Sequence, residues 1–277
     1  MRAALPGVLI LALLASPGLH ASPVLMSTNL CADALALELS APGQLSSVYW
    51  QSRDSRYSSF AKRVAHIPAN YASAEEALMT APQVLLASRR WQRRMPLTLL
   101  SEAGIRVAGV PYPQDWPGIS AALLEVGESI GRGDRAVQLR DSLEARLAAL
   151  GAAGQGRSAL YLRPNGGSAG QDTIIEVLFE SVGLKNHAAR FGLRGWGRVS
   201  VEALIADPPD LLMLGGMYRD GSYARSTFLR HPKIQAMIDT LPVLRLSHSD
   251  LLCNQWRLID VAENLSALLE GLPEQGS

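Results

Sequence analysis

Net charge is the first property that the sequence lacks. Its 277 residues include 26 Lys and Arg residues against 25 Asp and Glu residues. One of the basic residues, Arg2, lies in a segment that we expect to be removed, which leaves 25 residues of each sign. A chain without excess charge gives no electrostatic indication of a nucleic-acid partner or of an anionic membrane surface.

Motifs of common catalytic and cofactor sites are also missing. The sequence contains no G-x-S-x-G nucleophile elbow. The Gly-rich segment 164–170 lacks both G-x-G-x-x-G spacing and a P-loop lysine. Beyond residue 21 the histidines show no H-x-x-x-H spacing and are scattered over His66, His187, His231 and His248. We therefore expect no catalytic residue, no resident cofactor and no dedicated metal site.

Long apolar runs are confined to the N-terminus. Arg2 precedes an apolar run over residues 8–15, which Pro17 and Gly18 end before a stretch of small residues. This order is typical of a secretory signal peptide, and we predict cleavage after Ala21. No later segment is long enough to span a membrane.

What remains has the composition of a packed globular protein, with 48% hydrophobic and 18% charged residues. Strand and helix patterns alternate in the first half, with strands at 23–28, 45–50, 83–88 and 105–110 and helices at 31–42, 73–82 and 96–104. The alternation restarts later, with strands at 158–162, 210–215 and 241–247 and helices at 173–184, 200–209, 231–240 and 257–272. Such alternation predicts α/β units with parallel sheets.

Two consecutive helices separate these halves, at residues 116–131 and 134–150. The second helix carries an apolar stripe at Ala136, Leu139, Leu143, Leu147 and Leu150. At 1.5 Å per residue it is roughly 25 Å long. We therefore expect two α/β halves with a long helix between them.

One short sequence motif occurs twice. In each copy a serine is followed two residues later by glutamate and, seven residues after that, by proline. The pairs are Glu75 with Pro82 and Glu202 with Pro209, 127 residues apart. This spacing is too long for a solenoid repeat and fits two similar lobes.

These features together resemble a known family. The chain resembles periplasmic substrate-binding proteins of bacterial ABC importers. The resemblance lies in the paired S-x-E…P segments, the long helix between them, "YLRPNGGSAG" and "GWGRVSVEALIADPPDLLML". The relevant branch handles ferric siderophores, haem and cobalamin. The resemblance covers nearly the whole mature chain.

The resemblance implies two Rossmann-like lobes bridged by a single long helix, with a ligand cleft between the lobes. We expect a first lobe at 22–132, a bridging helix at 133–152 and a second lobe at 153–277. It also implies a monomeric periplasmic protein that delivers a metal chelate to an inner-membrane ABC permease. An exported metal- or thiol-dependent enzyme on the same scaffold is the alternative.

The resemblance gives the repeated glutamates a role. In this family one glutamate on each lobe docks on arginines of the permease, and the matching residues here are Glu75 and Glu202. Glu76 is a second candidate in the first copy, although its offset from the proline differs. The alternative is that both glutamates only start helices after Ser73 and Ser200.

Ligands of parallel sheets meet the loops after the carboxyl ends of the strands. That rule, with the resemblance, nominates Asn29, Cys31, Trp50, Arg89, Trp91, Trp116, Arg163, Asn165, Trp196, Tyr218, Cys253 and Trp256. It also nominates Tyr49, Arg90, Tyr112, Met217 and Arg219. All five tryptophans fall in predicted loops or at strand ends. Aromatic side chains suit a large flat ligand, and arginines suit its carboxylates or an anionic chelate.

The chain has only two cysteines, Cys31 and Cys253. Export to an oxidising compartment permits a disulfide between them. Such a bond would tie the lobes together and needs Cα atoms within about 7 Å. It would depart from the resemblance, which implies a disulfide within one lobe. Two thiols that contact the ligand or a metal, and two inert cysteines, remain alternatives.

Overall fold

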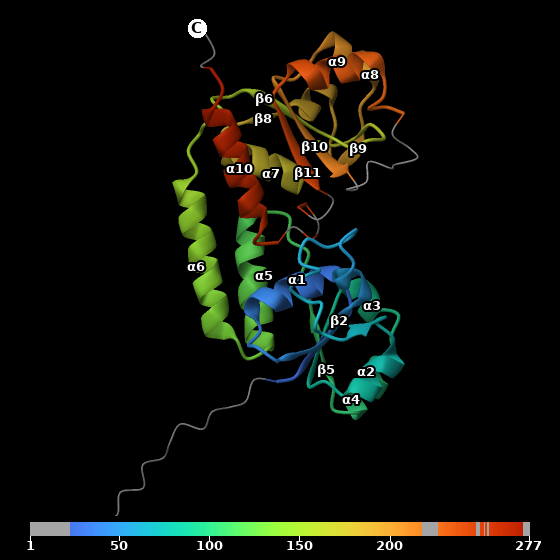
Figure 1. Ribbon diagram of the computed structural model, residues 1–277. Coiled ribbons are helices and arrows are strands. Elements are labelled where there is room, and N and C mark those ends of the chain that lie inside the picture. The colour runs from blue at the N-terminus through green and yellow to red at the C-terminus, as the bar shows by residue number, and fades with distance from the viewer. Residues whose placement is uncertain (1–22, 218–226, 248–249, 252, 254, 274–277) are drawn as a thin grey trace, which may run out of the picture.

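The computed structural model describes residues 23–217, 227–247, 250–251, 253 and 255–273. The predicted signal peptide lies outside the described residues, and so do Tyr218 and Arg219. The described chain forms two lobes, each built on a parallel sheet, as Figure 1 shows. The predicted α/β architecture is therefore confirmed. No helix in this part of the chain combines the length and apolarity needed to cross a membrane.

The first lobe contains a five-stranded parallel sheet with the order β3-β2-β1-β4-β5. Its strands are β1 (Leu25–Ser27), β2 (Leu45–Tyr49), β3 (Ala69–Asn70), β4 (Val84–Ala87) and β5 (Arg106–Gly109). Its helices are α1 (Leu30–Leu39), the 3-10 helix η1 (Trp50–Arg53), α2 (Ala74–Thr80), α3 (Arg89–Gln92) and α4 (Leu97–Glu102). All four β4 side chains are buried because Leu86 packs with α1 while Leu85 packs with α2 and α4.

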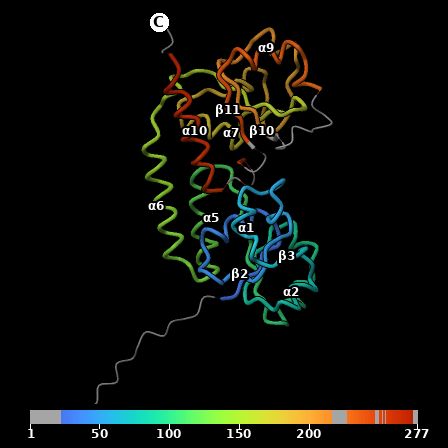
Figure 2. Tube along the Cα trace, viewed as in Figure 1, coloured from blue at the N-terminus to red at the C-terminus, as the bar shows by residue number. Residues whose placement is uncertain are grey.

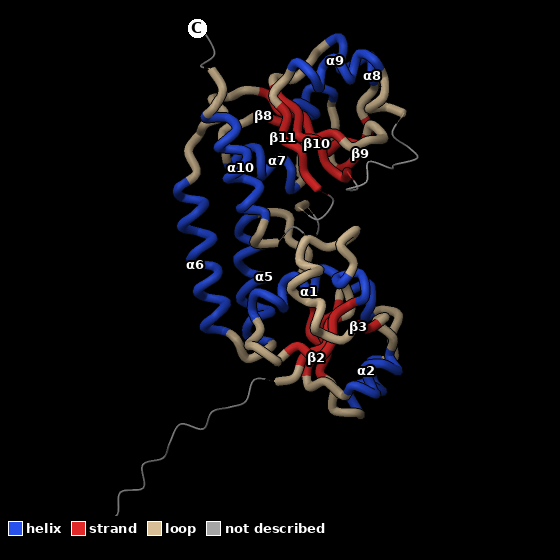
Figure 3. The backbone as a smooth tube through the Cα atoms, viewed as in Figure 1, coloured by secondary structure: helices blue, strands red, loops and turns tan. Residues whose placement is uncertain are grey.

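The second lobe contains a four-stranded parallel sheet with the order β11-β10-β6-β8. Its strands are β6 (Ser158–Leu162), β8 (Lys185–Asn186), β10 (Leu211–Met217) and β11 (Val243–Ser247). Its helices are α7 (Ile174–Ser181), η2 (His187–Phe191), α8 (Val201–Ala206), α9 (Pro232–Thr240) and α10 (Leu258–Glu270). Tyr161 packs with α7 and α10, whereas Leu160 packs with α8 and α9. Each sheet is thus covered by helices on both faces, as Figure 3 shows.

Two antiparallel helices connect the sheets, α5 (Trp116–Ser129) and α6 (Gly133–Ala149). The observed α6 begins and ends one residue before the predicted helix. Gly127 lets the pair approach closely, because a Cβ on this residue would lie 2.3 Å from the Ala136 Cβ. Leu139 and Leu143 of the predicted stripe are buried. In Figure 1 α6 runs along one side of the molecule from one lobe to the other.

The C-terminal helix α10 returns along the same side, beside α6 (Figure 2). Arg146 of α6 donates hydrogen bonds to Asp260 at 2.6 Å and to Glu263 at 2.5–2.6 Å, both on α10. A single apolar cluster continues from Leu35 of α1 through the helical pair to Leu265 of α10. The lobes therefore share a core on this side, where burial of each leucine contributes about 1.5–3 kcal/mol.

Some elements were not predicted because they are short. The Gly-rich segment, expected to be a loop, contains β7 (Gly167–Ala169), which pairs antiparallel with β9 (Trp196–Arg198). The loop expected after residue 88 contains α3. Elements of three or four residues do not show a measurable hydrophobic period, so sequence patterns cannot reveal them.

Candidate ligand-binding cleft

Loops at the carboxyl ends of the two parallel sheets meet between the lobes. Cys31 follows β1 and Tyr112 follows β5 in the first lobe, while Arg163 follows β6 and Cys253 follows β11 in the second. Cys31 is bonded to Cys253, and the charge of Arg163 lowers the pKa of the Tyr112 phenol, opposing the larger rise caused by burial. The space between the lobes is therefore bordered by strand-end loops, where open α/β sheets bind ligands.

Arg163 and Trp196 form a stacked pair on the second lobe. The guanidinium carbon of Arg163 lies 4.4 Å from the Trp196 ring centroid. The Arg163 Nε donates a hydrogen bond of 3.1 Å to Tyr161 Oη, and the Tyr161 ring meets Trp196 edge to face at 5.8 Å. About half of Trp196 is exposed (51%). A cation and an open aromatic face are thus held in a fixed geometry.

Asn165 shapes the turn that carries Arg163. Its Oδ1 accepts a hydrogen bond of 3.0 Å from the Gly167 backbone, and its carbonyl accepts one of 2.5 Å from Arg198 Nη2. Gly166 adopts a φ of +78°, which favours glycine. The oxygens of Asn165 therefore hold the β6–β7 turn, a structural task that the sequence prediction did not assign to this residue.

An aromatic cluster lies at the same edge of the first sheet. The Trp50 ring lies 5.9 Å from Tyr49, 5.8 Å from Tyr57 and 6.5 Å from Tyr71, centroid to centroid. Tyr71 stacks on Trp50 and is 71% exposed. Sequence reasoning nominated Trp50 and Tyr49 but missed Tyr57 and Tyr71. Tyr71 follows β3, whose two residues give no strand signal.

Trp91 is placed differently from the prediction. It lies inside α3 rather than in a loop, and its ring packs against the cluster that contains Leu85 and Leu100. Its Nε1 donates a hydrogen bond of 2.8 Å to the Ala72 carbonyl. The indole therefore has a packing role that the sequence did not indicate, and its place as a ligand contact stays a prediction. The claim that every tryptophan lies in a loop or at a strand end was wrong for this residue.

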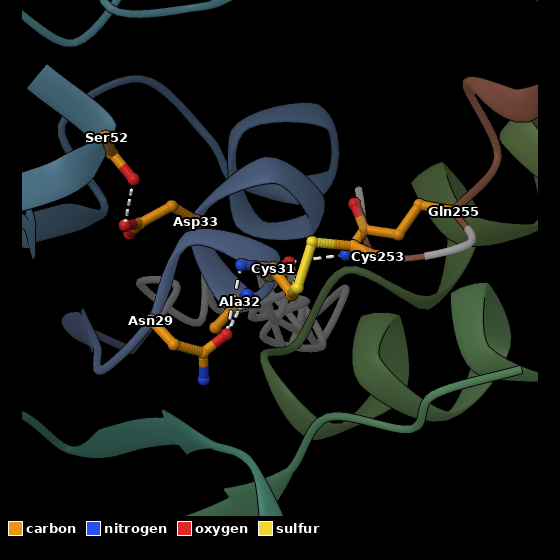
Figure 4. Close-up of a disulfide and its surroundings, with 7 residues drawn as sticks. All are labelled: Asn29, Cys31, Ala32, Asp33, Ser52, Cys253 and Gln255. Carbon is orange, nitrogen blue, oxygen red and sulfur yellow. Dashed lines mark hydrogen bonds between the residues drawn. A yellow bond between two sulfur atoms is a disulfide. The ribbon is translucent and has the colours of Figure 1, made fainter. Parts of the chain in front are cut away.

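Asp33, on the first turn of α1, holds the loop of Trp50 in place (Figure 4). The carboxylate is fully buried and accepts hydrogen bonds from Ser52 Oγ at 2.6 Å, from the Tyr49 backbone at 2.8 Å and from the Ser27 hydroxyl. Burial raises the pKa of Asp33 to about 7, although the three donors act in the opposite direction. Sequence analysis did not single out this residue.

The raised pKa predicts a pH dependence of stability. Folded Asp33 holds its proton up to about pH 7, whereas unfolded Asp33 releases it near 3.8. The unfolding free energy contributed by this group is therefore full below pH 4 and is lost as pH rises to about 7. An Asp33→Asn variant lacks this dependence, so we expect wild type to lose several kcal/mol relative to the variant between pH 4 and 8. Urea unfolding of both proteins across this range measures the difference, and parallel curves would contradict the prediction.

Cys31 and Cys253 form a disulfide between the lobes, with Cα atoms 5.3 Å apart (Figure 4). Next to it, Gln255 donates a hydrogen bond to the Cys31 carbonyl. Neither cysteine presents a free thiol in the structure. The sulfurs therefore serve as a tie at the edge of the cleft, and the interpretation as ligand-contacting thiols does not fit this geometry.

Near this disulfide, one partly buried carboxylate binds two half-exposed arginines. Glu38 of α1 accepts hydrogen bonds from Arg63 at 2.6 Å and from Arg257 of the second lobe at 2.8 Å. Burial alone would raise the pKa of the Glu38 carboxyl, but the two arginines lower it overall.

A pocket between Tyr57 and Arg257 encloses only about 40 Å³, too little for a chelate.

Three buried N–H groups near the strand-end loops have no hydrogen-bond partner among the described residues. They are the Nδ2 of Asn29 and the Nε1 atoms of Trp116 and Trp256. Both indoles also pack against the shared core, and Asn29 Oδ1 caps α1 by accepting from Cys31 N and Ala32 N at 3.0 Å. Buried donors without acceptors are rare in native proteins, and these three atoms are closed off from solvent within the packed core.

The two repeated glutamates lie exposed on helices of opposite lobes. Glu75 stands in the first turn of α2, where its own backbone N–H and the Ser73 hydroxyl lower the pKa of its carboxyl. Glu202 holds the same position in α8. Glu76 instead completes a capping box, accepting a hydrogen bond of 3.1 Å from the Ser73 backbone. Only Glu75 of this neighbouring pair therefore leaves its carboxylate available.

Strand-end loops of the two α/β lobes thus meet at the disulfide that joins them. Residues 49–239 match the periplasmic binding protein family, so the chain belongs to this family. The family implies a periplasmic location. Its members bind solutes for transport, and the alternative of an exported enzyme finds no support. No curated protein gives a significant match.

Solved structures share the fold at low identity. The periplasmic heme binding protein HutB of Vibrio cholerae aligns with a TM-score of 0.69 and 19% identity, over 88% of this chain and 98% of its own. A periplasmic heme binding protein from Pseudomonas aeruginosa aligns with a TM-score of 0.66 and 22% identity, over 92% of this chain and 95% of its own. An ABC-type Fe3+-hydroxamate transport system from Saccharomonospora viridis aligns with a TM-score of 0.63 and 18% identity, over 91% of this chain and 94% of its own. At these identities the likeness establishes the fold.

Proposed function

We propose that the protein captures a haem, cobalamin or ferric-siderophore chelate in the cleft and delivers it to an ABC permease of the inner membrane. The observation that carries this proposal is the Arg163–Trp196 pair at the strand ends of one lobe, with the Trp50–Tyr71 stack at the strand ends of the other. An open aromatic face suits a large flat ligand, and a guanidinium suits its acidic groups. The solved neighbours named for heme binding and Fe3+-hydroxamate transport support this class.

The proposed ligand contacts combine aromatic rings, cations and donors. They are Asn29, Trp50, Arg89, Tyr112, Trp116, Arg163, Trp196 and Trp256 from the sequence, with Tyr71 added from the structure. Tyr218 stays a prediction because it lies outside the described residues.

The other parts of the proposal concern export and docking. We expect a monomeric mature protein that begins after Ala21 and is divided at 22–132, 133–152 and 153–277. Glu75 and Glu202 dock on arginines of the permease, one from each lobe. Their exposure and matching helix positions support this role.

A ligand screen tests the proposed function. The mature protein is melted with hemin, cyanocobalamin and ferric tris-catecholate, hydroxamate and carboxylate chelates. A ligand at a hundredfold excess over its Kd stabilises the folded state by about 2.7 kcal/mol, which raises the melting temperature. A shift with one chelate supports the proposal. A flat response to the whole panel, with no binding by fluorescence quenching, would contradict it.

Replacement of Trp196 by alanine is expected to weaken binding of the chelate found in this screen at least tenfold. The change removes the exposed ring and frees Arg163, and a truncated aromatic hot spot typically costs 2 kcal/mol or more. Isothermal titration measures the Kd. A Trp196→Phe variant keeps a ring for stacking and should retain most of the affinity. Equal affinity of the alanine variant and wild type would remove Trp196 from the site.

A further inference from the structure

Four arginines form a patch on the surface of the first lobe. Arg89 and Arg90 belong to α3, and Arg93 and Arg94 follow at its end. All four residues are exposed. None of them forms an ion pair with a carboxylate within the described ranges. We call these residues the arginine patch.

The arginine patch adjoins the cleft. Its helix α3 begins two residues after β4 ends, at the carboxyl edge of the first sheet. Within α3, Trp91 Nε1 donates to the Ala72 carbonyl at 2.8 Å. The next residue back along the chain is Tyr71, whose exposed ring stacks on Trp50. Short contacts therefore connect the patch to the aromatic cluster at the cleft.

Positive charge also dominates the groups proposed to meet the ligand. They include Arg89 on the first lobe and Arg163 on the second, but no Asp or Glu. Two carboxylates close in sequence to Trp50 and Trp116 are engaged locally. Asp54 binds Arg56 at 2.5 Å, and Asp115 caps α5 by accepting from Gly118 N at 2.7 Å. The charge of the arginine patch is not neutralised by either group.

We propose that the arginine patch attracts a ligand with net negative charge to the cleft, and that the ligand of this protein is an anionic chelate rather than a neutral one. The inference rests on the proposed function and narrows its substrate class. Hemin with its two propionates and ferric tris-catecholates belong to this narrower class. Neutral corrinoids do not.

Long-range attraction has a kinetic signature. A cluster of charges of one sign beside a cleft raises the association rate of a ligand of the opposite charge by about 10- to 1,000-fold at low salt. The Debye length falls from about 30 Å at 0.01 M salt to about 3 Å at 1 M, so the gain disappears as salt is added. Dissociation depends on short-range contacts and changes little.

Stopped-flow tryptophan quenching measures the association rate of the mature protein with hemin, a ferric tris-catecholate and cyanocobalamin at several salt concentrations. The double variants Arg89→Gln/Arg90→Gln and Arg93→Gln/Arg94→Gln each remove two charges from the patch. The control Arg106→Gln/Lys185→Gln removes two charges at the first residues of β5 and β8, at the opposite edges of the two sheets.

An anionic chelate should bind wild type with a rate that falls about tenfold or more with rising salt, and Arg93→Gln/Arg94→Gln should lower the low-salt rate several-fold. The control should match wild type. Binding of cyanocobalamin alone, or rates that neither salt nor the Arg93→Gln/Arg94→Gln change alters, would overturn this inference and leave the proposed function standing. Binding of no panel member would overturn both.

Discussion

Reduction of the disulfide between Cys31 and Cys253 is expected to lower the unfolding free energy by about 2–4 kcal/mol. The bond joins residues 222 apart, and for a loop this long the chain-entropy estimate is about 5 kcal/mol. Cys253 has a φ of +81°, which non-glycine residues rarely adopt. Release of that conformation returns about 1–3 kcal/mol. Guanidinium titrations of the protein with and without reductant measure the difference.

The matched control for this prediction is a Cys31→Ser variant. It should unfold at the midpoint of reduced wild type and should not respond to reductant. Thiol titration of the native protein before and after unfolding reports the bond directly. Two free thiols in the air-oxidised native protein, or a wild-type midpoint that reductant leaves unchanged, would show that this tie does not stabilise the fold.

A Glu75→Ala/Glu202→Ala double variant is expected to lose more than a hundredfold in affinity for its permease. Removing one partner of a buried, hydrogen-bonded charge pair costs about 2–5 kcal/mol, and two such losses exceed a factor of 100. Both glutamates are exposed in the free protein and neither belongs to the proposed ligand contacts, so chelate affinity should not change. Binding to the permease in nanodiscs, and uptake into proteoliposomes, measure the effect.

Two control variants make this test specific. Glu144→Ala/Glu180→Ala removes two exposed glutamates from α6 and α7 and should dock as wild type does. Glu76→Ala removes the capping-box partner of α2, so it should lower stability by about 1 kcal/mol with little loss of docking. Uptake by the double variant at the wild-type rate would exclude the docking role.

The fold was predictable because its long elements have clear periods. The apolar β4 strand and α6 lie within one residue of their predicted bounds, and both serine-capped helices begin one residue after their predicted start. Short elements such as β3, β7 and α3 were missed, since their stability comes from neighbours in space. Their absence from the prediction had consequences for the site, because Tyr71 follows β3 and Trp91 lies in α3.

The site was only partly predictable for a related reason. The rule of strand ends nominates loops, but it cannot say which side chain in a loop faces inward. Trp91 turned out to pack under the sheet, and Asn165 holds a turn. The role of Asp33 depends on β1 lying beside β2, so that Ser27, Tyr49 and Ser52 surround one carboxylate. Contacts between residues on neighbouring strands depend on the order of the strands in the sheet, and local sequence patterns do not encode that order.

The disulfide also sets an order of events during biosynthesis. Cys31 is among the first residues of the mature chain to leave the ribosome, and Cys253 follows 222 residues later. At about 5–20 residues per second, the first thiol waits roughly 10–45 s for its partner. The helix α10, which completes the shared core, emerges later still. A nascent or truncated chain therefore carries a free, oxidisable thiol, and only a chain made almost to its end can close the seam between its lobes.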